Sequence, residues 1–300
     1  MSGALQVFYA NFRSFVSGAK AIFGFGTSGT SFIDLYSNTG VFVSTTSGVG
    51  TARTSLAAAG YGTDKAIFGY GQTTVNVSMT NLVSNTGVVS TDVTGVGTAR
   101  NSLAAAGYGT DKAIFGYGYN SASTYVSMTN LVSNTGVVSF DTAGVGTTRN
   151  NLAAAGYGAD KAIFGYGLNI SNFSITNLVS NTGVVAANTT GVGTARNSLA
   201  AAGYGTDKAI FGYGSTGVNV SVIDLYSNTG VFASTTSGVG TARANLAAAG
   251  YGTDKAIFGY GFSTTNVSIT NLVSNTGVVA NDVTSGGFTR NSLAAASYGS

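Results

Sequence analysis

The stretch LAAAGYGTDKAIFGYG, residues 56–71, decides the fold because the chain repeats it almost unchanged. Close copies begin at Leu103, Leu152, Leu199 and Leu246. One arginine precedes each copy, and successive arginines are 47, 49, 47, 47 and 47 residues apart. A fixed period of this length indicates an array of equal structural units. The arginines are Arg53, Arg100, Arg149, Arg196, Arg243 and Arg290.

Each unit predicts four short strands, and the unit that starts at Arg53 serves as the example. Its first two strands are expected at Leu56–Tyr61 and Lys65–Tyr70, joined by a tight GTD turn. The third and fourth are expected at about Val77–Ser84 and Val88–Val93, joined by an SNTG turn whose Asn and Gly suit positive φ. Four short strands in a unit of this length predict one blade of a β-propeller.

The sizes of the side chains support a propeller. Residues 57–60 are Ala-Ala-Ala-Gly, which suit the crowded inner strand nearest the axis. In the second strand Phe68 and Tyr70 share one apolar face, and Gly69 and Gly71 lie on the other. We expect these glycines to leave room for an aromatic ring of the adjacent blade.

The two ends of the repeat array predict a closed ring. The C-terminal RNSLAAASYGS stops at the point of the unit where the first repeat begins, at Ala19. A strand at Leu293–Tyr298 can therefore complete the blade that starts at Lys20, which leaves no open sheet edge. An open solenoid is the alternative architecture, and Phe15–Ser17 is a competing first strand for the closure. Six equivalent lysines predict six blades: Lys20, Lys65, Lys112, Lys161, Lys208 and Lys255.

The expected fold is all-β: a six-bladed, kelch-like β-propeller over residues 19–300, preceded by a non-repeat segment over residues 1–18. This segment is apolar and aromatic, and we expect it to dock the propeller to a larger assembly; plugging the channel is the alternative. It is a poor secretory signal, and no apolar run is long enough to predict a membrane span. The candidate docking residues are Leu5, Val7, Phe8, Tyr9 and Phe12.

The residue inventory argues against an enzyme. The chain has no Cys or His, and all ten acidic residues are Asp, so a triad or a pair of glutamates cannot form. A ring of equal groups also lacks the dissimilar side chains that catalysis brings to one point. No catalytic residue, cofactor or metal is expected, because Asp34, Asp224 and the Asp92, Asp141 and Asp282 set lack the dense spacing of a calcium loop. The evenly spread basic residues do not indicate a nucleic acid partner.

The repeated charges have structural interpretations. Asp64 and its equivalents are expected to cap the GTD turn, and the neighbouring lysines to be solvated. A lysine ring that binds an anionic partner is the alternative. The arginines are expected to tie carbonyls of adjacent blades together, with anion binding near the axis as the alternative.

Variation between units gathers in the loop between the second and third strands. This loop and the linkers between units should emerge on one face, and the two constant turns on the other. Loops rich in Asn, Ser, Thr and Tyr suit hydrogen bonding and stacking on sugars or proteins, although drift is an alternative. The candidate binding residues are Gln72, Asn76, Tyr119, Asn120, Tyr125, Asn169, Asn172, Asn219, Phe262 and Asn266.

The order of signals in RTSLAAAGYGTDKAIFGYG resembles a kelch repeat up to its double glycine, which Tyr70 splits here. FIDLYSNTGVF and VIDLYSNTGVF look most like the third and fourth kelch strands, although Phe42, Phe232 or Val stands where kelch repeats have Trp. This resemblance covers residues 19–300 and implies the fold rather than an activity.

The DKAIFGYG repeats also resemble those of structural proteins of tailed phages that infect marine cyanobacteria and other marine bacteria. This resemblance implies a non-catalytic virion protein, present in several copies. Its expected partners are other virion proteins and a host-surface glycan or receptor. A free-standing multivalent lectin is the alternative.

Overall fold

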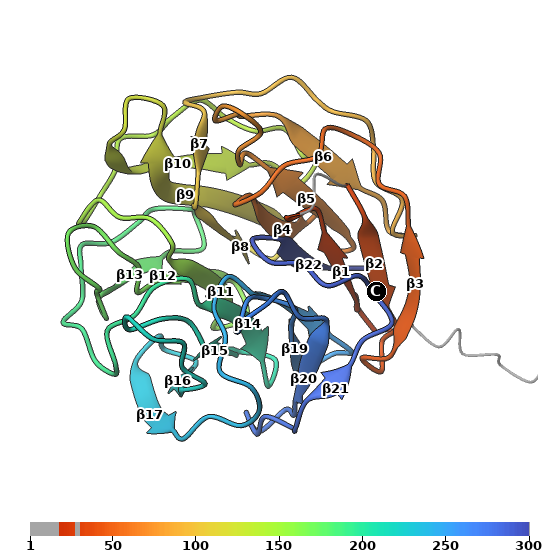
Figure 1. Cartoon of the computed structure of the whole chain (residues 1–300). Coiled ribbons are helices and arrows are strands. Elements are labelled where there is room, and N and C mark those ends of the chain that lie inside the picture. Colours follow the sequence, from red (N-terminus) through yellow and green to blue (C-terminus); the bar gives the residue numbers. More distant parts are fainter. Residues whose placement is uncertain (1–17, 28–30, 300) are drawn as a thin grey trace, which may run out of the picture.

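The computed structural model describes residues 18–27 and 31–299. They form six small antiparallel sheets arranged around an axis as the blades of a β-propeller (Figure 1). The candidate docking residues Leu5, Val7, Phe8, Tyr9 and Phe12 and the competing strand Phe15–Ser17 lie outside the described residues.

The blades follow one another in chain order. The first contains β22 (Ala294–Tyr298), β1 (Lys20–Gly24), β2 (Ile33–Tyr36) and β3 (Phe42–Thr46). The second contains β4 (Ala57–Tyr61), β5 (Lys65–Gly69) and β6 (Thr80–Val83). The third contains β7 (Arg100–Asn101), β8 (Ala104–Tyr108), β9 (Lys112–Asn120) and β10 (Tyr125–Val132). The fourth contains β11 (Ala153–Tyr157), β12 (Lys161–Gly165) and β13 (Thr176–Val179). The fifth contains β14 (Ala200–Tyr204), β15 (Lys208–Gly212), β16 (Ile223–Tyr226) and β17 (Phe232–Thr236). The sixth contains β18 (Ala247–Tyr251), β19 (Lys255–Gly259), β20 (Ile269–Val273) and β21 (Val283–Thr284).

The C-terminal strand completes the first blade. β22 pairs antiparallel with β1 in a register that runs from Lys20 opposite Tyr298 to Gly24 opposite Ala294. The two ends of the repeat array therefore meet within one sheet, at the place that the sequence offsets predict.

A ring of backbone hydrogen bonds runs around the axis where the linkers enter the inner strands. In each blade one residue just before the inner strand donates its N–H to the carbonyl of its equivalent in the preceding blade, at 2.8–2.9 Å. Ser55 donates to Ser292, so the ring closes between the ends of the array. Each residue has a φ of 50–54°, in the left-handed region. The ring consists of Ser55, Ser102, Asn151, Ser198, Asn245 and Ser292.

A second ring closes at the opposite ends of the inner strands. The glycine of each GTD turn donates its N–H across to the neighbouring turn, as Gly62 does to the carbonyl of Asp111 at 2.7 Å. Gly252 donates to Ala19 and Gly299 to Asp64, both also at 2.7 Å. The inner strands are thus linked at both ends.

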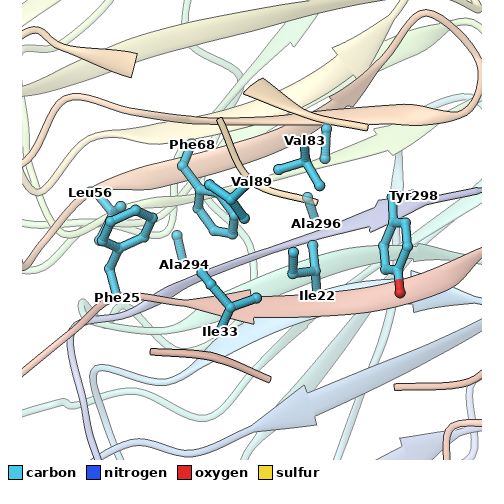
Figure 2. Packing of buried hydrophobic residues seen from close by; sticks show 11 residues of the cluster. Ile22, Phe25, Ile33, Leu56, Phe68, Val83, Val89, Ala294, Ala296 and Tyr298 are labelled. Carbon is cyan, nitrogen blue, oxygen red and sulfur yellow. The ribbon is translucent and has the colours of Figure 1, made fainter. Parts of the chain in front are cut away.

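The core lies between the blades. Each of six buried apolar clusters combines residues of two neighbouring blades, and together they cover all six junctions. Figure 2 shows the cluster between the first and second blades, where Phe68 packs beside Ile33 and Ala294. The ring of Phe68 also occupies the space over Gly24, since a Cβ there would lie 2.8 Å from the Phe68 Cζ. The prediction that glycines make room for an aromatic ring of the next blade is confirmed for Gly69, where a Cβ would lie 2.7 Å from the Phe115 Cζ. It is wrong for Gly71, where a Cβ would meet Thr54 and Leu56.

The outer strands differ from the prediction. The second strand of the example unit ends at Gly69, because Tyr70 adopts a left-handed φ of 60°. The third strand begins at Thr80 rather than near Val77, and the fourth is reduced to isolated bridges at Val89 and Val93. A side chain replaces part of the backbone ladder here, because the Oγ of Ser90 accepts the N–H of Leu82 at 2.9 Å.

The glycine contacts give a test of the packing between blades. A Cβ at Gly116 would lie 2.7 Å from the Cζ of Phe164, whereas the nearest atom to a Cβ at Gly156 would be 3.6 Å away. Gly116→Ala should therefore lower the free energy of unfolding by about 1–3 kcal/mol, measured by chemical denaturation. Gly156→Ala is the matched control, and an equal loss in both variants would contradict the packing argument.

Candidate functional site

The structure separates a variable face from a constant face. On the variable face the loops between second and third strands meet the linkers, as when Asn101 donates from Nδ2 to the Oδ1 of Asn76 at 2.7 Å. On the constant face the two tight turns meet, as when Asn85 donates to the Oδ2 of Asp64 at 3.1 Å. The prediction that the variable loops and the linkers share one face, and the two constant turns the other, is confirmed.

Several candidate binding residues of the variable face hold neighbouring blades together. Asn76 donates to the carbonyl of Tyr119 at 3.1 Å, and Asn219 donates to the carbonyl of Phe262 at 3.0 Å. Their equivalents bond in the same direction, from Asn172 to the Ser215 carbonyl and from Asn266 to the Thr27 hydroxyl. Asn169 differs, because it donates to the carbonyl of Thr148 in the linker. These amides give the face a fixed shape.

The remaining candidates lie at the surface of the same loops. Tyr119, near the end of β9, and Tyr125, at the start of β10, form an edge-to-face pair with ring centroids 5.2 Å apart, on either side of the tip of that hairpin. Asn120 accepts the backbone N–H of Thr124 and so shapes the tip of that loop. Gln72 and Phe262 are exposed at equivalent positions of the second and sixth blades.

The sequence analysis missed the apolar tips of three variable loops. Val75, Ile170 and Val218 are 63%, 97% and 71% exposed, in the second, fourth and fifth blades. With Phe262 they place apolar surface beside polar amides on one face. In the sequence each of them is a single apolar residue within an otherwise polar loop. A comparison of the units with one another shows that the loops vary, but it does not show which loop residues are exposed.

On the constant face, four of the five turn aspartates are held by the other turn of their blade. The carboxylate of Asp111 accepts from Asn134 at 3.1 Å and lies 3.0 Å from the Nζ of Lys112. The hydrogen bond from Lys112 is the main cause that lowers the pKa of Asp111. We expected this carboxylate to cap its own turn. The bond from Asn134 instead links the GTD turn to the SNTG turn of the same blade.

A ring of exposed valines surrounds the constant turns. Each follows an SNTG turn, and each is 61–66% exposed. The residues that follow differ from blade to blade, for example VSTDVT after Val88 and VAANTT after Val184. The valine directly after the SNTG turn is the same in all six blades. The ring consists of Val41, Val88, Val137, Val184, Val231 and Val278.

The six repeated arginines lie between blades and are at most 2% exposed. Arg100 donates from Nε to the carbonyl of Tyr117 in its own blade at 2.9 Å, and its guanidinium stacks 4.2 Å from the Tyr70 ring of the preceding blade. The neighbouring blade thus contributes an aromatic ring and not the carbonyl that was expected. Burial raises the pKa of Tyr70 to about 12, so its O–H stays a donor, here to the carbonyl of Val96. Such enclosed guanidiniums are packing groups rather than anion receptors.

The charge partner of the arginine takes two forms. In the first and fifth blades Asp34 and Asp224 are fully buried, and Asp224 lies 2.5 Å from Arg196. In the other four blades an asparagine occupies the equivalent position. In three of them an aspartate eleven residues later is the nearest carboxylate to the arginine, as with Asp141 at 3.9 Å from Arg100. The fourth blade has Asn188 there, so Arg149 has neither carboxylate. The aspartates considered for calcium are therefore arginine partners.

Within residues 18–27 and 31–299 no cluster of three His, Cys, Asp or Glu side chains suits a metal ion. Among the same residues no helix has the length and apolar character to cross a membrane.

No family model matches this chain, and no curated protein matches it. The resemblance to kelch repeats and to phage repeats therefore stays a prediction.

The fourth blade gives a test of the arginine partners. Asn188→Asp should raise the free energy of unfolding by up to about 1 kcal/mol, because it supplies Arg149 with the carboxylate that three other blades have. Denaturant unfolding near neutral pH measures the change. A variant that is less stable than the wild type would show that Asn188 is already the better partner.

The converse change is Asp141→Asn, which should destabilise the protein by a similar amount. Burial alone would raise the pKa of Asp141, but hydrogen bonds from Thr98 and Asn130 and the charge of Arg100 lower it below its ordinary value. A lowered folded-state pKa gives stability that is present above the ordinary value of about 3.9 and is lost as the pH falls through the folded value. The difference between the variant and the wild type should therefore shrink at acid pH.

Proposed function

We propose that this chain is a non-catalytic structural and attachment protein of a tailed-phage virion. The observation that supports it best is the division of one rigid ring into two faces, one nearly identical in every blade and one individually shaped. A constant face suits attachment to an assembly, and a variable face suits recognition of a neighbour or of the host surface. The assignment to a phage virion is based on the resemblance of the DKAIFGYG repeats to those of phage structural proteins.

The distribution of chemistry fits a binding module. The arginines and two of the aspartates are enclosed between blades, where they stabilise packing. What the variable face offers is apolar tips, an aromatic pair and amides held in place by bonds between blades. Surfaces of this kind bind by shape and stacking.

The constant face has its own basis for attachment. Six valines project at equivalent positions around one turn-built surface, and exposed apolar side chains in such an array favour burial against another protein. Because the array repeats six times around the axis, a partner could be engaged at several equivalent points.

Cryo-electron microscopy of native particles tests the virion assignment. We expect density for a six-bladed propeller fixed to the particle, with the valine ring towards the particle and the Tyr119 loop outward. Detection of the chain only as a free monomer would contradict the proposal.

A lectin is the second candidate, because the Tyr119–Tyr125 pair and the loop amides suit the face and edge of a sugar. If it is correct, a glycan array with the isolated propeller gives specific binding. Tyr125→Ser should then weaken that binding about tenfold, the worth of one good stacking contact. Val88→Ser, on the opposite face, is the control and should leave it unchanged.

A further inference from the structure

A funnel opens on the propeller axis at the constant face. It has a volume of about 330 Å³ and is walled by the ends of the inner strands and by the GTD turns of the blades. Volumes of this size are at the lower end of those that hold small ligands. Glycines of the inner strands, such as Gly60 and Gly107, also line it.

The funnel wall is rich in ammonium groups. Five lysines line it, and the one carboxylate among its lining residues is that of Asp254, as far as the described residues show. The lysines are Lys65, Lys112, Lys161, Lys208 and Lys255.

The turn aspartates pair with four of these lysines and offset part of the charge. All but Asp254 are absent from the funnel lining, and asparagines of the SNTG turns bond to their other carboxylate oxygen. Asn85 and Asn134 donate to the carboxylates of Asp64 and Asp111, both at 3.1 Å. Four of the five lysines lie within ion-pair distance of the neighbouring aspartate, as at 3.2 Å between Lys65 and Asp64. An ammonium has three donors. Donors are thus left for a ligand on the axis.

We propose that this funnel binds a compact anion that carries several phosphate groups. Lysines act as point charges on flexible stems and bind phosphate without the fixed fork geometry that arginine gives to carboxylates. Every arginine of the repeats is enclosed between blades, so the funnel has charge without that fork. A ring of ammonium groups around one axis matches an anion whose charges are clustered and arranged around a centre.

The site is separate from the variable face and adds to the proposed function rather than following from it. The funnel lies at the centre of the valine ring, so an anion held there would be enclosed when this face docks.

Isothermal titration calorimetry with inositol hexakisphosphate and with inorganic tripolyphosphate tests the proposal. We expect one ligand per chain and an affinity that falls as salt is raised, because ion pairs at an open mouth are screened. Monophosphate at the same ionic strength should bind at least about tenfold more weakly, since it meets fewer of the ammonium groups. Equal binding of monophosphate, or no binding at low salt, would overturn the proposal.

Variants locate the site. Lys112→Gln, Lys161→Gln and Lys208→Gln combined should weaken binding about tenfold or more, whereas the same three positions as Arg should retain it. Val75→Asp, Ile170→Asp and Val218→Asp combined are the matched control, because they lower the net charge by the same amount at exposed positions of the variable face and should leave binding unchanged. Unchanged binding in the triple Gln variant, with an unchanged unfolding curve, would show that the anion binds elsewhere.

Discussion

The ring of six backbone hydrogen bonds around the axis is the interaction on which the rest of the structure depends. Each bond joins the residue before one inner strand to its equivalent in the next blade, and Ser55 closes the circle on Ser292. Bonds of this length require the inner strands to approach closely, which only Ala and Gly permit. The repeated AAAG is therefore a requirement of the closed ring, and the outer strands can vary because they do not share it.

The arginines show how a chain with few charges uses them. Burial of a guanidinium is costly unless hydrogen bonds and a partner offset it, and here one aromatic ring and several oxygens surround each arginine. The carboxylate stands at one of two positions, as Asp224 in one blade and Asp141 in another. The hydrogen bonds around the arginine change with it, since Arg100 bonds to Asn130 where Arg196 bonds to Asp224. The junction thus tolerates exchange of its charge partner while keeping the stacked cation.

The sequence allowed prediction of the blades, their number and the strand that completes the first, because these follow from spacing and from residue size. The limits of the third and fourth strands were not predictable, since they depend on which backbone groups bond to side chains such as Ser90. The role of Asn76 likewise depends on the distance from its loop to the next blade, where Tyr119 supplies the carbonyl. A lysine ring that binds an anion was an alternative from the sequence, but five of the six lysines follow an Asp. The sequence does not show where those carboxylates lie, which depends on bonds such as that from Asn85 to Asp64.

The shared first blade has a consequence for synthesis of the chain. β1 is made early, but its inner partner β22 is made last, so one edge of β1 stays unpaired while the other blades form. Every inner strand made in between carries nearly the same AAAGY sequence and could pair with that edge in the wrong place. The last strand alone has Ser297 in place of the glycine, and its Oγ donates to the carbonyl of Gly250 at 2.8 Å. This hydroxyl is a feature of the final strand that its five competitors within the chain lack. The last strand of another nascent chain carries the same serine, so exchange of the final strand between copies is a route to misassembly.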